Sequence, residues 1–269
     1  MPELPEVETT RRGIAPLIED AVIERVIVRD RRLRWPVPPD LEQRLAGQRI
    51  QAVQRRAKYL LLRLDDCELI VHLGMSGSLR FLEDRTPPGA HDHIDWVFAN
   101  GTLRLNDPRR FGCVLLANKA DRHRLIADLG PEPLEADFSL DYLQQACRGR
   151  RVAIKQLLMN AHVVVGVGNI YANEALFRAG IHPRRAAGRI SRDRLQRLIT
   201  AVREVLNESI EHGGTTLRDF VGGDGRPGYF RIELKVYERA GDACERCGTP
   251  IRRIVQGQRA TYYCARCQR

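Results

Sequence analysis

The chain has 269 residues and a formal net charge of +10, with 43% apolar and 29% charged residues. That length is enough for one large domain or two ordinary ones with buried cores. No apolar run approaches the roughly 18–20 residues of a membrane span, and the start MPELPEVETTRRG lacks the apolar centre of a signal peptide. We therefore expect a cytoplasmic protein with no membrane partner.

The positive charge is unevenly spread along the chain. The segment from Arg218 to the end, about a fifth of the sequence, carries half of the excess charge. A basic protein attracts polyanions, which include nucleic acids, acidic lipid surfaces and acidic proteins. The concentration near the C-terminus favours a docking surface for one of them.

The first half of the sequence predicts one helix followed by strands. Pro5 suits the first turn of a helix over about residues 5–15, and Pro16 is expected to kink or end it. Strand-like runs follow at residues 22–28, 50–64, 68–73, 78–82, 93–98, 102–105 and 113–116. Asn100-Gly101 predicts a tight hairpin turn, and Asp40 a short helix that closes at Gly47. Together these elements predict a β-sandwich or barrel with an N-terminal helix.

The turn-rich segment near residues 131–137 marks a change of pattern. Beyond it, Ser191 is expected to cap a helix whose apolar residues recur at intervals of three and four until Gly213. Shorter helices fit residues 140–147, 152–160 and 172–179. We predict an α+β protein with a domain boundary near residues 131–137.

The last 26 residues contain two CxxC pairs, formed by Cys244, Cys247, Cys264 and Cys267. Four thiolates at this spacing suit a tetrahedral Zn²⁺, and a full set of protein ligands leaves no position for water or substrate. Residues 251–255 and 258–263 predict a hairpin between the pairs. Two disulfides or a redox pair are the alternative, which a reducing cytoplasm disfavours. We predict a zinc ribbon that holds one structural zinc ion.

Five segments, in order along the chain, carry a family resemblance. They are PELPEVET at 2–9, HLGMSGSLR at 72–80, DPRRFG at 107–112, GVGNIYANEALF at 166–177 and the paired CxxC motifs. Together they closely resemble formamidopyrimidine-DNA glycosylase. The resemblance implies an N-terminal helix and β-sandwich catalytic domain over 1–131, a helix–two-turn–helix DNA-binding domain over 132–220, and a lesion loop with the zinc ribbon over 221–269.

The same resemblance implies an activity. The family flips oxidised purines, such as 8-oxoguanine and formamidopyrimidines, out of damaged double-stranded DNA and excises them. It then cleaves the strand at the abasic site by β,δ-elimination. The resemblance implies a bacterial cytoplasmic enzyme, which we expect to be monomeric.

The terminal proline has the chemistry that the resemblance assigns to it. A Schiff base requires an unprotonated amine, and an α-amino group has a pKa near 7.7–8.0 against about 10.4 for lysine. The secondary amine of Pro2 would form a cationic iminium, an electron sink for elimination, but only after Met1 has been removed. By resemblance, Glu3 is the general acid/base, Lys58 a second proton donor and phosphate contact, and Arg259 serves late elimination. Taken alone, these residues read as a helix-starting proline, a first-turn acid and a solvated strand lysine.

The resemblance also assigns residues that contact DNA. An extruded base leaves a gap in the stack that inserted side chains fill, and the matching wedge residues are Met75, Arg109 and Phe111. The positions that match backbone-phosphate contacts are His91, Arg150, Lys155 and Asn169. Two acids that position other groups near the active site are Glu6 and Glu174.

Two other functions stay open on the sequence. A sister enzyme of the same fold excises oxidised pyrimidines, although its terminus usually reads PEGPE rather than PELPE. A zinc-ribbon DNA-binding protein without chemistry would also be basic. Arg218 stands where close relatives often have lysine, and the Gly-rich segment 221–230, which closes over the extruded base in the family, leaves the lesion preference open.

Overall fold

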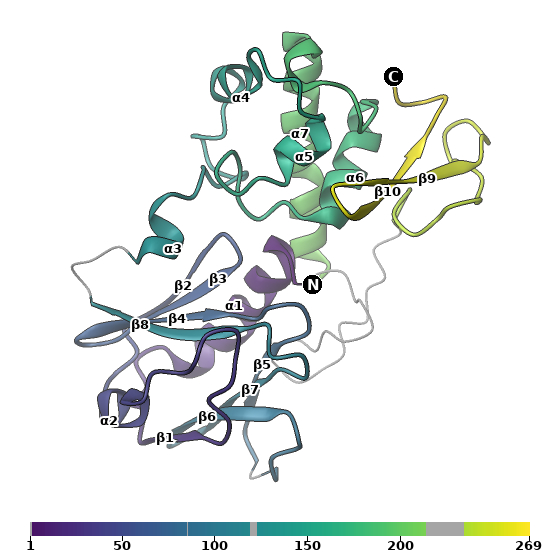
Figure 1. Ribbon diagram of the computed structural model, residues 1–269. Helices are drawn as coiled ribbons and strands as arrows, with labels where there is room; N and C mark the ends of the chain where they lie inside the picture. Colours follow the sequence, from purple (N-terminus) through teal and green to yellow (C-terminus); the bar gives the residue numbers. More distant parts are fainter. Residues whose placement is uncertain (1, 85, 119–122, 214–233) are drawn as a thin grey trace. The chain divides into compact units, whose positions relative to one another are not determined.

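The computed structural model describes residues 2–84, 86–118, 123–213 and 234–269 (Figure 1). The chain divides into two compact units, one made of Met1–Ala127 with His212–Phe230, the other of Asp128–Glu211 with Arg231–Arg269. Among the described residues, no helix is both long enough and apolar enough to cross a membrane.

The first unit begins with helix α1 (Leu4–Ile18). Its N-terminus is closed by the backbone N–H of Glu3, which donates to the Glu6 carboxylate at 2.8 Å, one half of a capping box. Pro16 was expected to kink or end the helix, but α1 continues through it to Ile18. Pro16 stands exposed in the last turn, where only Leu17 and Ile18 follow it in the helix.

Among the described residues of the first unit, eight strands form two antiparallel four-stranded sheets, ordered β1-β6-β7-β5 and β2-β3-β4-β8 (Figure 1). The strands are β1 Arg25–Val28, β2 Ala52–Arg56, β3 Tyr59–Arg63, β4 Cys67–His72, β5 Ser78–Leu82, β6 Asp92–Phe98, β7 Gly101–Asn106 and β8 Cys113–Asn118. Two short helices accompany them, α2 (Leu41–Leu45) and α3 (Arg124–Ala127). One apolar cluster includes Ile14 of α1, Leu60 and Leu69 of one sheet, and Trp96 and Leu103 of the other. The unit is therefore a β-sandwich rather than a barrel.

Two strand predictions need correction. The run at 50–64 is two strands, β2 and β3, because the chain turns at Ala57, whose φ of 57° is left-handed. No Gly or Asn announces that turn in the sequence, and Lys58 consequently lies in a turn rather than in a strand. The hairpin loop between β6 and β7 is Ala99-Asn100, one residue earlier than expected, since Phe98 pairs with Gly101.

The second unit combines helices with a β-hairpin. Its elements are α4 Leu140–Cys147, α5 Ile154–Leu158, α6 Asn169–Ala179, the 3₁₀ turn η1 Ala187–Arg189, α7 Arg192–Glu211, β9 Ile251–Gln256 and β10 Arg259–Cys264. Helix α6 packs against both α7 and β10. It ends at Gly180, which takes the left-handed conformation (φ 70°) that favours glycine at a helix C-terminus.

Helix α5 is shorter than the predicted 152–160, and α6 begins three residues before the predicted 172. The start of α6 at Asn169 matters because it places this side chain in the first turn of a helix. The three-domain division stays a prediction, since its second boundary, at 220/221, lies outside the described residues.

Candidate functional site

The N-terminus is anchored rather than frayed. Pro2 is buried, and Glu3 beside it is only 2% exposed at the head of α1. The burial of Leu4 and Val7 in the first turns draws the terminus against the sandwich. Pro2 and Glu3 are therefore held in a fixed position at the head of α1.

An ion-pair chain connects α1 to the turn that carries Lys58. Arg55 of β2 contacts the Glu8 carboxylate at 3.2 Å and donates to the carbonyl of Ala57 at 3.0 Å. Arg11, which lies three residues after Glu8 on α1, also pairs with the Glu8 carboxylate at 2.9 Å. Arginines and hydrogen bonds around Glu8 hold the pKa of its carboxyl below the usual value, although burial opposes them. Neither Arg55 nor Glu8 was predicted to belong to the site, because their contact depends on how α1 packs against β2.

His72 lies close to the same turn. Its ring centroid is 4.8 Å from that of Tyr59, and its Nδ1 accepts a hydrogen bond from the N–H of Gly74 at 2.9 Å. Burial, aided by the charges of Lys58 and Arg34, lowers the pKa of His72 to about 4. The ring is therefore neutral at pH 7 and serves as an acceptor for the turn that follows β4.

The three residues predicted to form the wedge lie on two adjacent turns of the first unit. Met75 and Phe111 are among the exposed large apolar side chains, at 38% and 43%. The Arg109 guanidinium stacks over the Phe111 ring, 4.9 Å from its centroid. Exposed apolar groups beside a planar cation are suited to stacking on nucleic-acid bases.

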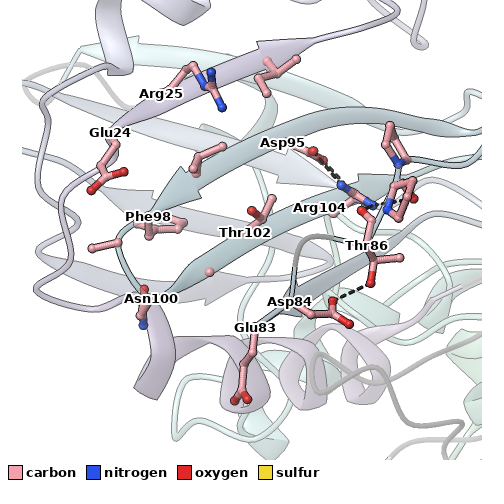
Figure 2. Close-up of a pocket in the computed structure, with 16 residues that line it drawn as sticks. Glu24, Arg25, Glu83, Asp84, Thr86, Asp95, Phe98, Asn100, Thr102 and Arg104 are labelled. Atoms are coloured by element: carbon pink, nitrogen blue, oxygen red, sulfur yellow. Dashed lines mark hydrogen bonds and ion pairs between the residues drawn. The ribbon is translucent and has the colours of Figure 1, made fainter.

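His91 is exposed at the end of a loop whose backbone is held by hydrogen bonds from the adjacent sheet. Asp95 and Arg104 pair across β6 and β7, facing away from the core, with Nε to Oδ1 at 2.8 Å (Figure 2). Arg104 also donates to the carbonyls of Thr86 and Pro87 and so clamps that loop. A hollow of 560 Å³ lies over this pair, and none of the predicted site residues lines it (Figure 2). We interpret the network as support for the loop that precedes His91.

Lys155 is placed differently from a surface phosphate contact. Its side chain is 1% exposed, and its Nζ donates to Asn169 Oδ1 at 2.6 Å, Thr261 Oγ1 at 2.7 Å and the Ala260 carbonyl at 3.1 Å. Asn169 itself donates to the same Ala260 carbonyl at 3.1 Å. A buried ammonium with these acceptors ties the first turn of α6 to β10.

Arg150 and Arg259 are both exposed on the second unit. Arg150 lies between α4 and α5, where its carbonyl accepts from the N–H of Gly188 at 3.0 Å. Arg259 follows the two-residue turn of the β9–β10 hairpin, in which Gly257 and Gln258 both have positive φ, as in a type I′ turn. The turn type therefore fixes where the Arg259 side chain leaves the hairpin.

The four ribbon cysteines form a set suited to metal binding. Their ligand atoms all lie within 4.8 Å of one another, with Sγ separations of 3.9 Å for Cys244–Cys267 and 3.4 Å for Cys247–Cys264. A tetrahedral Zn²⁺ with bonds of about 2.3 Å places its sulfurs about 3.8 Å apart. All four thiols fit that geometry, so the set can hold zinc with no open position.

Glu174 of α6 binds the backbone of residues 235–237, which precede the zinc ribbon in the chain. Its buried carboxylate accepts three backbone N–H groups, from Lys235 at 2.9 Å, Val236 at 3.0 Å and Tyr237 at 2.8 Å. Burial raises the pKa of this carboxyl, and the three donors oppose the shift. Glu174 therefore has a positioning role within the second unit, while Glu6 caps α1 in the first. Arg218 and residues 221–230 lie outside the described residues.

Comparisons with known proteins cover nearly the whole chain. Residues 1–114 match the formamidopyrimidine-DNA glycosylase N-terminal domain, residues 129–221 its H2TH domain, and residues 241–269 a zinc finger found in FPG and IleRS. Formamidopyrimidine-DNA glycosylases of Stutzerimonas stutzeri and Marinobacter nauticus are 59% and 58% identical over 270 residues, covering all of both chains.

Solved structures of related proteins are also similar to this chain over nearly its whole length. The Thermus thermophilus protein is 40% identical with a TM-score of 0.88, covering 99% of this chain and 98% of that one. The Lactococcus lactis protein in complex with abasic-site DNA is 34% identical with a TM-score of 0.92, covering 99% of each chain. A Lactococcus lactis mutant bound to Fapy-dG DNA is 33% identical with a TM-score of 0.91, covering all of both.

Fold and site together define a zinc-containing DNA-repair enzyme with a helix–two-turn–helix domain. More particularly, the chain belongs to the formamidopyrimidine-DNA glycosylase family. It is a DNA glycosylase and abasic-site lyase of base excision repair, its partner is DNA, and its ribbon holds one structural zinc ion. The family resemblance, the fold class and the zinc prediction are confirmed.

Proposed function

We propose that the Pro2 amine is the nucleophile with which this enzyme excises oxidised purines, such as 8-oxoguanine and formamidopyrimidines, and cleaves the strand. The observation that carries the proposal is the burial of the Pro2–Glu3 terminus at the head of α1. Free termini are usually loose, so an ordered one in a glycosylase requires a reason. The mechanism requires that Met1 be removed first, because an amide nitrogen has no basic lone pair.

The steps balance without an external oxidant or reductant. The Pro2 nitrogen bonds to the sugar C1′ while the glycosidic bond breaks, and the base leaves with the proton that this nitrogen loses. Glu3 protonates the ring oxygen as the sugar opens, which leaves an iminium on Pro2. The Glu3 carboxylate, now deprotonated, takes a C2′ proton as the 3′ phosphate leaves. Loss of a C4′ proton to solvent then expels the 5′ phosphate, and water hydrolyses the iminium and restores the Pro2 amine. Lys58 and Arg259 are the proposed proton donor and phosphate contact for these eliminations.

DNA binding rests on a second group of residues. Met75, Arg109 and Phe111 fill the space that the extruded base leaves, which their exposure and the Arg109–Phe111 stack support. The backbone-phosphate contacts proposed on the surface and at the start of α6 are His91, Arg150 and Asn169. Lys155 acts with them by holding the Asn169 amide and adding a buried positive charge behind it.

We place the enzyme in the bacterial cytoplasm as a monomer. Cys67, Cys113 and Cys147 are buried and form no disulfide among the described residues, and the ribbon needs its thiols reduced, which suits a reducing compartment. Light scattering during size-exclusion chromatography tests the monomer, and a mass of twice the chain would refute it.

Borohydride trapping tests the catalytic proposal. The enzyme is mixed with duplex DNA holding 8-oxoguanine opposite cytosine, reduced, and digested for mass spectrometry. We expect a covalent adduct on Pro2 and an intact mass that lacks Met1. Binding without any adduct would refute the nucleophile, and faster release of thymine glycol than of 8-oxoguanine would make this an oxidised-pyrimidine enzyme.

A further inference from the structure

The wedge residues come from two turns, residues 73–77 and 107–112, which are packed backbone to backbone. A Cβ on Gly74 would lie 2.4 Å from the nitrogen of Gly112, and one on Gly112 would lie 2.6 Å from the carbonyl of His72. Neither contact leaves space for a side chain. The turn that carries Met75 is thus in direct contact with the turn that carries Phe111.

The side chain of Asp107, the first residue of the second turn, contacts both turns. It is 0% exposed, and its Oδ2 accepts the N–H of Gly112 at 2.7 Å, next to Phe111. Its Oδ1 faces the hydroxyl of Ser76, next to Met75, at 3.4 Å. A buried carboxylate that accepts from two segments fixes their separation, because withdrawing either donor leaves an unsatisfied buried acceptor.

The backbone of Asp107 is tied to a third predicted DNA contact. Its N–H donates to the carbonyl of His91 at 3.0 Å, and its carbonyl lies 2.9 Å from Nε2 of the buried His93. Arg110, two residues before the end of the turn, pairs with Asp30 at 2.7 Å. The exposed side chains therefore stand on a backbone that is fixed at several points.

We propose that Asp107 is a positioning residue for the wedge: its carboxylate holds the Met75 and Phe111 turns at the separation that base extrusion requires. The proposal rests on the function proposed above for Met75, Arg109 and Phe111. Asp107 itself is fully buried, so it acts through the two turns that it joins. A displacement of about 1 Å in such a group costs on the order of 10²-fold in rate.

The test compares a substrate that needs the wedge with one that does not. Asp107→Ala is assayed for excision of 8-oxoguanine from duplex DNA and for cleavage of a single-stranded oligonucleotide that already holds an abasic site. We expect duplex excision to fall on the order of 10- to 100-fold, with single-strand cleavage within about 3-fold of wild type. A 2-aminopurine opposite the lesion should lose the fluorescence rise that reports unstacking.

Asp107→Asn is the rescue variant, because its carbonyl oxygen can accept from Gly112 while its amide donates to Ser76. We expect it to recover most of the duplex excision. Leu103→Val is the stability control: this side chain is fully buried in the core of the same unit and belongs to neither turn. It should lower the unfolding temperature without changing the ratio of the two activities. If Asp107→Ala does not fold, Asp107→Asn combined with Ser76→Ala removes the bridge to the Met75 turn and should give a smaller selective loss.

The outcomes separate this proposal from the catalytic one. An equal loss on both substrates, or no loss on either, would overturn the positioning role of Asp107. Absence of a trapped adduct in the wild-type enzyme on abasic DNA would instead overturn the Pro2 mechanism. Selective loss on duplex DNA with a normal adduct supports both.

Discussion

The β-sandwich and the zinc ribbon are stabilised in different ways. The sandwich encloses a continuous apolar cluster between its two sheets, with Leu60, Trp96 and Leu103 almost fully buried. The ribbon cluster is small, and Cys244 and Cys264 within it are also metal ligands. Small folds without a sufficient core depend on disulfides or metals. The difference shows that the sandwich can hold its residues in place by packing, whereas the ribbon holds Arg259 through zinc and through its contacts with α6.

Removal of one zinc ligand should have the largest effect. Cys247→Ser is expected to release zinc, unfold the hairpin and lower the affinity for lesion DNA by more than about 10²-fold, since zinc contributes most of the folding free energy of such modules. Zinc content is measured by metal analysis and affinity by titration. Cys147→Ser, a buried thiol elsewhere in the second unit, should retain zinc. An unchanged DNA titration for Cys247→Ser would contradict the ribbon's role.

The second effect concerns the terminus held by the sandwich. Pro2→Gly should reduce base excision on the order of 10²-fold or more while leaving DNA affinity within a few-fold, because it replaces the nucleophile and not the DNA-contacting surface. Single-turnover excision and a binding titration measure the two quantities. Pro16→Ala, in the exposed last turn of the same helix, is the control. Loss of affinity with normal excision would refute the assignment.

A core substitution in the sandwich should affect stability but not zinc. Leu60→Ala removes a fully buried side chain and is expected to cost about 2–5 kcal/mol of unfolding free energy, measured by urea denaturation. Val255→Ala, 58% exposed on the ribbon, should change it by less than about 0.5 kcal/mol. Zinc loss in Leu60→Ala under native conditions would show that zinc binding by the ribbon depends on the packing of the sandwich core.

The smallest effect is a pH dependence within the sandwich. The pKa of His72 is about 4 in the folded chain and about 6.5 in the unfolded chain. Between these two pH values the unfolded chain therefore binds a proton on His72 that the folded chain does not bind. Stability due to this group is complete above about pH 6.5 and is lost as the pH falls toward 4, by about 1–3 kcal/mol. His72→Asn keeps an acceptor for Gly74 and should remove that part of the slope. Parallel slopes for variant and wild type would contradict the shift.

The sequence by itself determined those features that depend on neighbours along the chain. The ribbon followed from two CxxC pairs, the long α7 from its apolar spacing, and the family from motifs that are contiguous in sequence. Periodicity also predicted most strands, but it merged β2 with β3 because the turn at Ala57 has no characteristic residue. Local chemistry is sufficient where the physical constraint is itself local.

Only the tertiary structure decided how distant segments meet. The burial of Lys155 depends on acceptors about a hundred residues away on β10, and the contact between Glu8 and Arg55 depends on how α1 lies against β2. Asp107 became identifiable as the residue beneath Met75 and Phe111 only when both turns were seen in contact. The sequence shows which groups can donate or accept, but the packing within each unit fixes which of them come within hydrogen-bonding distance.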